Sequence, residues 1–170
     1  MPDLQAIAEI TSCGHAALAY AARGWHVFPC RPGGKEPLGK LAPHGVKDAT
    51  TDPEQIRRWW TACPDANVGV ACGKSALVVV DCDGAEGVAT FAAWAEANDV
   101  ALGDVPCAAT PRGGRHYYFA APAGAALGPK VRVLPGVDVR AGESYVVAPP
   151  SRWNGKQKGD ENLQPGTDVG

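Results

Sequence analysis

The feature of this sequence that most restricts its fold is a short aliphatic segment that leads directly into two acidic residues. Residues 77–80 carry only aliphatic side chains, and Asp81 and Asp83 follow at once. A strand that is apolar at every position has to be covered on both faces, so residues 77–80 are predicted to form a buried, central strand. Residues 86–97 then repeat apolar side chains at helical spacing. The two acids are therefore expected between a buried strand and a helix.

The rest of the chain is predicted to alternate between helices and strands, with hairpins towards its end. A loop rich in Gly and Pro is expected at residues 30–49, and Gly24 stands where a helix C-terminus belongs. Residues 51–54 combine capping side chains with a proline, which is typical of a helix start. Helices are predicted at residues 4–22, from 51 onwards and at 86–97, and strands at residues 25–28, 68–71, 77–80, 108–110, 116–119, 137–139 and 145–148.

The length and composition of the chain suit one globular domain. With 170 residues, of which 45% are hydrophobic, the chain can bury a core of its own. Beyond residue 153, by contrast, Leu163 and Val169 are the only large apolar residues. We therefore predict one domain over residues 1–153 and a polar tail or linker over residues 154–170.

Charge, cysteine spacing and hydropathy argue against several kinds of protein. A net charge of -2 and a pI near 6.1 argue against strong, sequence-independent electrostatic binding of nucleic acid. None of the six cysteines forms the C-x-x-C spacing of zinc ribbons or redox motifs, so reduced thiols are expected. The longest aliphatic run, residues 76–80, is far short of the ~20 apolar residues that span a bilayer. No Lys or Arg precedes Arg23, so we predict a cytoplasmic protein without a signal peptide.

Asp81 and Asp83 are candidate ligands of a divalent metal ion. Residues two apart in a strand project from the same face, so the two carboxylates are expected to converge, with Cys82 on the opposite face. Carboxylates this close repel each other unless a cation lies between them, and hard oxygen ligands suit Mg²⁺ or Mn²⁺. The alternative is structural, with Asp83 and Gly84 forming a turn that caps the following helix.

A second candidate group lies in residues 110–116, where a glycine-rich turn enters a strand. Gly114 would let the backbone approach a ligand closely. His116 follows Arg112 and Arg115, a combination that suits contact with a triphosphate. The alternative is a surface or core histidine next to an ordinary solvated turn.

A third candidate segment, residues 136–140, places Asp138 and Arg140 in alternation with two valines. The acid and the arginine are therefore expected on one face of a strand. Asp138 would complete a metal site, or it would simply pair with Arg140 at the surface. Basic residues that would line a phosphate groove, unless they are scattered surface charges, are Lys35, Lys47, Arg112, Arg115 and Arg140.

The tryptophans fall into two groups. Trp25, Trp59, Trp60 and Trp94 lie in helix or strand patterns and are predicted to belong to the core. Trp153 differs, because its polar surroundings indicate an exposed segment where the ring would be able to stack on a base.

Seven of these segments carry a family resemblance when they are taken in order. They are residues 24–29 (GWHVFP), 31–35 (RPGGK), 47–52 (KDATTD), 67–70 (NVGV), 80–84 (VDCDG), 110–116 (TPRGGRH) and 136–140 (GVDVR). Over about residues 16–151, the chain resembles the bifunctional DNA primase/polymerase amino-terminal domain. This is the Prim-Pol branch of the archaeo-eukaryotic primase superfamily. Seven segments in one order are far more specific than a single pair of acids.

The resemblance implies template-directed nucleotidyl transfer, as a DNA primase, a DNA polymerase or both, in replication initiation of a plasmid, phage or related element. It assigns two divalent ions, Mg²⁺ or Mn²⁺, to Asp81, Asp83 and Asp138. It adds His116 to this catalytic group as the contact of the incoming triphosphate. Further residues in matching, nucleotide-binding segments are Lys35, Arg112, Gly114 and Arg115. The implied partners are a single-stranded DNA template, an NTP or dNTP, and a helicase domain or subunit, with no membrane.

The implied fold is α+β, with a central antiparallel or mixed sheet resembling an RNA-recognition-motif core, flanking helices and a small amino-terminal subdomain. Two functional alternatives stay open. Residues 78–84 also resemble the nucleophile motif of haloacid-dehalogenase-type phosphatases, in which Asp81 would be the nucleophile and Asp83 the acid/base. Ala85 departs from that motif, and its later lysine and paired acids are not found. The other alternative is a non-catalytic nucleic-acid-binding module.

Overall fold

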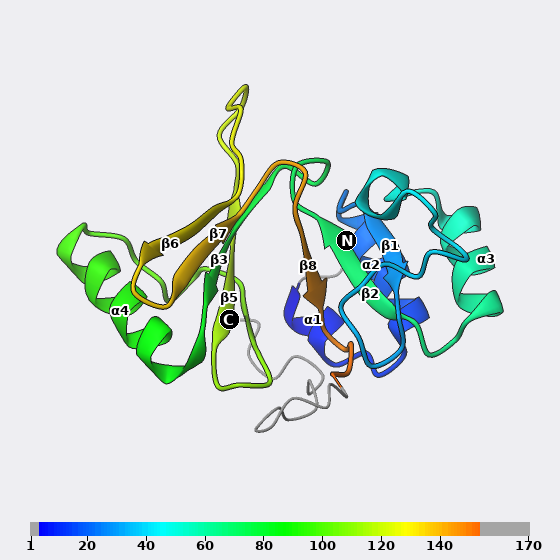
Figure 1. Cartoon of the computed structure of the whole chain (residues 1–170), viewed down its shortest axis with the longest axis horizontal. Coiled ribbons are helices and arrows are strands. Elements are labelled where there is room, and N and C mark those ends of the chain that lie inside the picture. The colour runs from blue at the N-terminus through cyan, green and yellow to red at the C-terminus, as the bar shows by residue number, and fades with distance from the viewer. Residues whose placement is uncertain (1–3, 154–170) are drawn as a thin grey trace.

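The structure is a computed structural model that describes residues 4–153. This part of the chain folds into two antiparallel sheets with helices packed against them (Figure 1). The α+β class is therefore confirmed, and each strand pair in the described range is antiparallel rather than mixed. The likeness to an RNA-recognition-motif core stays a prediction, and the predicted tail at 154–170 lies outside the described residues.

The helices and the strands are each numbered in their order along the chain. The helices are α1 (Leu4–Ala8), α2 (Cys13–Ala22), the 3-10 helix η1 (Gly45–Asp48), α3 (Pro53–Ala62) and α4 (Gly84–Ala97). The strands are β1 (Val27–Cys30), β2 (Asn67–Ala71), β3 (Leu77–Cys82), β4 (Cys107–Ala109), β5 (Arg115–Ala120), β6 (Lys130–Leu134), β7 (Val137–Arg140) and β8 (Tyr145–Ala148).

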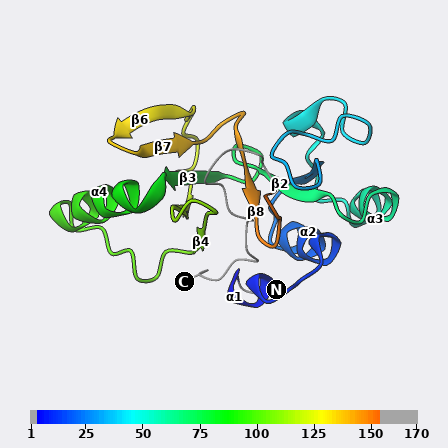
Figure 2. The same ribbon diagram turned by 60° about the horizontal axis from the view of Figure 1, so that its bottom comes forward.

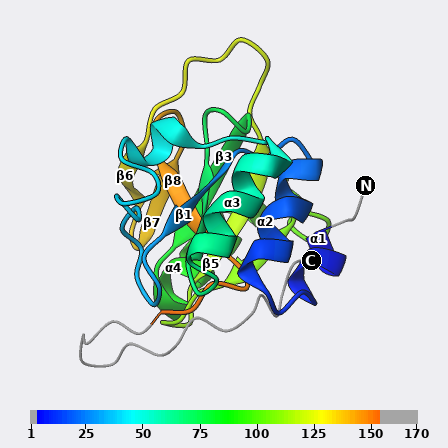
Figure 3. The same cartoon turned by 90° about the vertical axis from the view of Figure 1, so that its right-hand side faces the viewer.

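The smaller lobe is built on the three-stranded sheet, in the order β1-β2-β8. Helices α2 and α3 lie side by side against this sheet (Figures 1 and 3). Helix α3 begins as predicted, because the Asp52 carboxylate accepts a hydrogen bond from the Glu54 amide at 3.0 Å and Pro53 occupies the first turn. The predicted amino-terminal subdomain is thus present, but its third strand, β8, comes from the other end of the domain.

The five-stranded sheet, in the order β4-β5-β3-β7-β6, contains the predicted central strand, β3. Helix α4 covers one face of this sheet, on the side away from the smaller lobe (Figures 1 and 2). Alternation along β3 places Val80 and Cys82 in a core cluster with Phe91 of α4, whereas Val79 joins the core of the smaller lobe. Asp81 shares the parity of Val79, so its side chain is directed towards the smaller lobe.

Three local predictions are wrong. The helix expected at residues 4–22 is broken into α1 and α2, because Ser12 caps α2 by accepting the His15 amide at 3.4 Å. Strand β6 was not expected, although Lys and Arg alternate with valines there. It lies at the sheet edge, and Arg132 interrupts its ladder with a φ of 50°. Trp94 stacks on Phe91 but is 41% exposed, so it is not a core residue.

The six cysteines all lie in the described range and carry free thiols. Burial, together with the charge of Asp81, raises the pKa of the Cys82 thiol to about 12, which keeps this thiol protonated at neutral pH. Within residues 4–153, no helix combines the length and the apolar character needed to cross a bilayer.

Candidate active site

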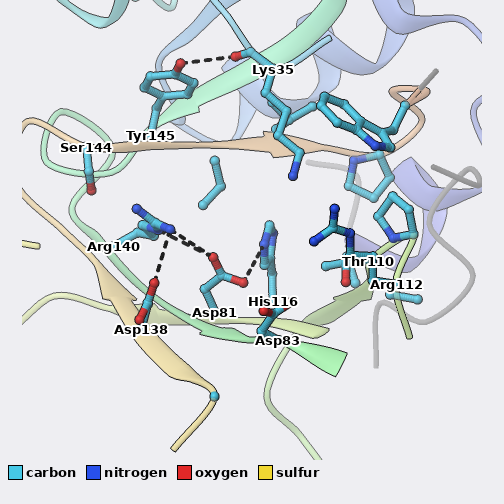
Figure 4. A pocket seen from close by; sticks show the side chains of 18 of the residues that line it. Lys35, Asp81, Asp83, Thr110, Arg112, His116, Asp138, Arg140, Ser144 and Tyr145 are labelled. Carbon is cyan, nitrogen blue, oxygen red and sulfur yellow. Dashed lines mark hydrogen bonds and ion pairs between the residues drawn. The ribbon is translucent and has the colours of Figure 1, made fainter. Parts of the chain in front are cut away.

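Three of the predicted site residues form a row across the centre of the five-stranded sheet. His116 on β5 and Asp138 on β7 are both direct cross-strand partners of Asp81 on β3. Residues opposite one another on neighbouring antiparallel strands project from the same face. The three side chains therefore gather at one place, where Figure 4 shows them next to one another.

The face that carries this row is one wall of a cavity of about 1060 Å³. The opposite wall comes from the smaller lobe and includes Lys35 and Tyr145 (Figure 4). Trp153 lines the cavity next to Lys35. Residues from segments far apart in the sequence thus line the same cavity. The predicted site residues that line it are Lys35, Asp81, Asp83, Arg112, His116, Asp138 and Arg140.

Asp81 lies between His116 and Arg140. Its Oδ1 is 3.2 Å from His116 Nε2, and its Oδ2 is 3.3 Å from Arg140 Nη2. Burial alone would raise the pKa of the Asp81 carboxyl group. The hydrogen bond from His116 and the charges of His116 and Arg140 outweigh that effect, so the pKa lies below its ordinary value of 3.8. Asp81 is therefore a carboxylate at neutral pH.

Asp138 is held by main-chain and side-chain donors. Its Oδ1 accepts the backbone amide of Arg132 at 2.7 Å, and its Oδ2 is 3.4 Å from Arg140 Nη2. The Arg132 amide reaches the carboxylate because β6 bulges at this residue, where φ is 50°. The predicted pairing of Asp138 with Arg140 is thus present. Asp138 also lies opposite Asp81, and its role in a metal site stays a prediction.

Asp83 lies one residue beyond β3, at the N-cap position of α4. The alternative that it merely caps this helix is not supported, because its side chain makes no capping hydrogen bond in the described structure. Its backbone amide donates to the Gly136 carbonyl at 2.8 Å, which anchors the turn to the hairpin before Asp138. The exposed carboxylate of Asp83 lines the cavity beside Asp81.

Gly114 does not line the cavity, although it was predicted to approach a ligand. It is buried where the turn before His116 presses against the end of β3. A β-carbon at this position would collide with the Cys82 carbonyl oxygen and would lie 2.7 Å from Thr110 Oγ1 and 3.0 Å from the Gly84 nitrogen. The glycine is therefore needed for contact between two segments of the site itself, not for contact with a ligand.

Two of the basic residues predicted for the phosphate groove lie elsewhere. Arg115 precedes His116 on β5 and projects from the opposite face, where its Nη1 lies 3.3 Å from Cys107 Sγ. Lys47 is outside the cavity lining, and its carbonyl oxygen accepts a hydrogen bond from Lys74 Nζ at 2.6 Å. Lys35 and Arg112 do reach the cavity.

Asn67 is a site residue that the sequence argument missed. Its side chain is buried, its Nδ2 donates to the carbonyls of Gly34 at 2.9 Å and Arg152 at 2.7 Å, and its Oδ1 accepts the Arg152 amide at 2.9 Å. These bonds join the loop before Lys35 to the segment before Trp153. Lys35 Nζ lies 4.6 Å from the centre of the Trp153 ring, a cation-π contact within the cavity wall. The sequence did offer one signal for this role, because Asn67 is a polar residue at the start of a strand that is otherwise apolar.

Replacement of Asn67 by Ala is expected to destabilise this wall. The change leaves two carbonyls and one amide without their partner, so the free energy of unfolding should fall by about 1–3 kcal/mol. Urea unfolding followed by circular dichroism measures the loss. Asn98→Ala is the control, because the Asn98 side chain is exposed and bonds to the Trp94 carbonyl at the end of α4. Equal stability of the two variants would contradict the role given to Asn67.

The chemistry of the cavity fits a divalent cation. Asp81, Asp83 and Asp138 offer the carboxylate oxygens that Mg²⁺ and Mn²⁺ prefer. In residues 4–153, however, no three His, Cys, Asp or Glu side chains lie close enough together to hold a metal ion as they stand. The Arg140 guanidinium contacts both Asp81 and Asp138, so a positive charge of the chain itself lies where two of the acids approach each other.

Comparison with known proteins identifies the family of this chain. The family model for the bifunctional DNA primase/polymerase N-terminal domain, Prim-Pol, matches residues 17–162. A search of curated proteins found no match. The matched region contains every residue that lines the cavity. The chain therefore belongs to the Prim-Pol family of bifunctional DNA primase/polymerase N-terminal domains.

Proposed function

We propose that this chain joins nucleotides by template-directed transfer, as a DNA primase, a DNA polymerase or both. Its family implies an enzyme of the nucleotidyltransferase type. The observation that carries the proposal is the row of His116, Asp81 and Asp138 facing a cavity of about 1060 Å³. Ligand pockets usually have volumes of roughly 300–1,000 Å³, so the cavity is large enough for a nucleotide.

Asp81, Asp83 and Asp138 are the residues that would hold two divalent ions, Mg²⁺ or Mn²⁺. Such ions, when bound, activate the attacking 3′-hydroxyl and neutralise charge on the transferring phosphoryl group. The lowered pKa of Asp81 supports this role, because the group is ionised at neutral pH and offers its oxygens as ligands. Asp83 contributes an exposed carboxylate on the same side of the cavity.

His116, Arg112 and Lys35 would bind the triphosphate. Contact with Asp81 orients the His116 ring, whose Nε2 faces the carboxylate at 3.2 Å. Lys35 approaches from the smaller lobe, and Arg112 from the turn before β5, so positive charges flank the cavity on both walls (Figure 4). Phosphoryl transfer depends mainly on such positioning and charge stabilisation, whereas pairing with the template selects the base.

The proposed partners are a single-stranded DNA template, an NTP or dNTP, and a helicase domain or subunit. The proposed setting is replication initiation of a plasmid, phage or related element. The acidic net charge of -2 argues that contacts with the template are confined to the surroundings of the cavity.

Primer extension that depends on a divalent metal ion is the expected activity. The full chain is incubated with a primed single-stranded template and labelled dNTPs, with Mg²⁺, with Mn²⁺ or with EDTA, and the products are resolved on a gel. Extension is expected with at least one metal and should disappear in EDTA, because no divalent ion is then present to activate the 3′-hydroxyl. Unprimed templates with NTPs then test for priming.

Two other outcomes would favour the alternatives. Release of phosphate from a simple phosphomonoester, without extension, would favour a phosphatase with Asp81 as nucleophile. Binding of single-stranded DNA without incorporation of any nucleotide under either metal would favour a non-catalytic module.

A further inference from the structure

Arg140 contacts two of the three acids of the proposed metal site. Its Nη2 lies 3.3 Å from Asp81 Oδ2 and 3.4 Å from Asp138 Oδ2, and its Nε lies 3.4 Å from the same Asp81 oxygen (Figure 4). One guanidinium thus bridges carboxylates from two neighbouring strands. It supplies the positive charge that a divalent ion would supply between the same two acids.

The second oxygen of each carboxylate already has another partner. Asp81 Oδ1 faces His116 Nε2 at 3.2 Å, and Asp138 Oδ1 accepts the Arg132 amide at 2.7 Å. The two Oδ2 atoms are the oxygens on which a cation shared by Asp81 and Asp138 would have to replace Arg140 and no other group. These are the atoms that contact Arg140.

The contacts of Arg140 are loose enough to be exchanged. Hydrogen bonds between a guanidinium and a carboxylate usually measure about 2.7–2.9 Å, and those of Arg140 are longer, at 3.3–3.4 Å. The Arg140 side chain lines the cavity and is 35% exposed. It can leave the acids without the opening of either core cluster.

We propose that Arg140 and the divalent ion compete for Asp81 Oδ2 and Asp138 Oδ2. This inference rests on the proposed function, because it takes the two acids as metal ligands. In the metal-free chain Arg140 keeps the carboxylates paired, and it has to withdraw before a cation can bridge them. Arg140 is therefore a positioning residue that sets the affinity of the site for its metal ion.

Arg140→Gln is the variant that tests the competition, with Mn²⁺ alone as the ligand in isothermal titration calorimetry. The variant is expected to bind Mn²⁺ about tenfold more tightly than the wild type, because a competing and repelling charge is gone. In EDTA its melting temperature should be lower, because Asp81 and Asp138 then repel each other without compensation. A residue with a merely structural role would weaken metal binding and stability together. Mn²⁺ binding by R140Q that is equal to or weaker than wild type would overturn the proposal.

Two further variants separate competition from general electrostatics. Arg132→Gln removes the same charge from the cavity lining and keeps the backbone amide that holds Asp138. Relative to the wild type, the gain in Mn²⁺ affinity should be much smaller for R132Q than for R140Q. Arg140→Lys retains the charge, so its affinity should lie between those of the wild type and R140Q. An equal gain in R132Q and R140Q would show a general charge effect and would overturn the competition.

A measurement on the wild type decides the question if R140Q does not fold. The Nε-Hε signal of Arg140 in a nitrogen-proton NMR spectrum, assigned by its absence from the R140K spectrum, is followed during addition of Mg²⁺. The signal should shift as the ion saturates the site, while that of Arg132 stays in place. An unmoved Arg140 signal at saturation would overturn the proposal.

These outcomes also separate this inference from the proposed function. If neither the wild type nor R140Q binds Mn²⁺ or Mg²⁺, the acids are not a metal site, and both proposals fail. If the wild type binds metal but Arg140 neither moves nor affects the affinity, the competition alone fails.

Discussion

Primer extension by an Asp81→Asn variant is expected to fall by more than about 100-fold, while the protein keeps its fold. Asp81 is the central member of the row, with His116 and Asp138 as its direct cross-strand partners. Asparagine has the same shape and can still bond to His116, so the local structure should persist. It lacks the negative charge that a divalent ion requires, so the metal-dependent activity should be lost.

Asp104→Asn is the matched control for this experiment, because it makes the same chemical change at an exposed residue outside the cavity. Its extension rate should equal that of the wild type. Circular dichroism melting of both variants then shows that the fold is retained. Undiminished extension by the Asp81 variant would place the catalytic acids elsewhere in the chain.

Replacement of Gly114 by Ala is expected to lower both stability and activity. The added β-carbon would collide with the Cys82 carbonyl oxygen and crowd Thr110 Oγ1 at 2.7 Å. Overpacking of this kind costs about 1–3 kcal/mol, and for a chain of this length each kcal/mol lowers the melting temperature by about 2–4 °C. Because the strained contact joins the turn before His116 to the segment that carries Asp83, extension should fall as well.

The control for this change is Gly103→Ala, where a β-carbon would meet no atom within 4 Å. Its stability should stay within about 0.5 kcal/mol of the wild type. Thermal melting and the primer extension assay are applied to both variants in parallel. A Gly114 variant as stable and as active as the Gly103 variant would show that the turn can move away from β3 without consequence for the site.

Much of the local structure could be read from the sequence, because local rules decide it. The aliphatic residues 77–80 predicted a central strand, and β3 is central. The cap at Asp52 and the proline after it predicted the start of α3, which begins at Pro53. Alternation predicted that Asp138 and Arg140 share a face, and both line the cavity. In each case the signal lies within a few residues of the feature that it predicts.

The wrong predictions concern features whose sequence signal is weaker than the pattern of the neighbouring residues. Helical composition ran through residues 4–22, and one capping serine divided it into two helices. The edge strand β6 was missed, and with it the Arg132 amide that holds Asp138. Arg115 was grouped with His116 by proximity in sequence, but neighbours in a strand project from opposite faces.

The sequence by itself determined which side chains could do the chemistry and on which face of its own strand each would lie. Only the tertiary structure decided that His116, Asp81 and Asp138 are opposite one another, because strand order and register depend on packing between segments distant in sequence. The same holds for Asn67, which joins two loops across the smaller lobe, and for Arg140, whose guanidinium reaches acids on two strands. Local patterns set the direction of a side chain, and long-range packing sets its partners.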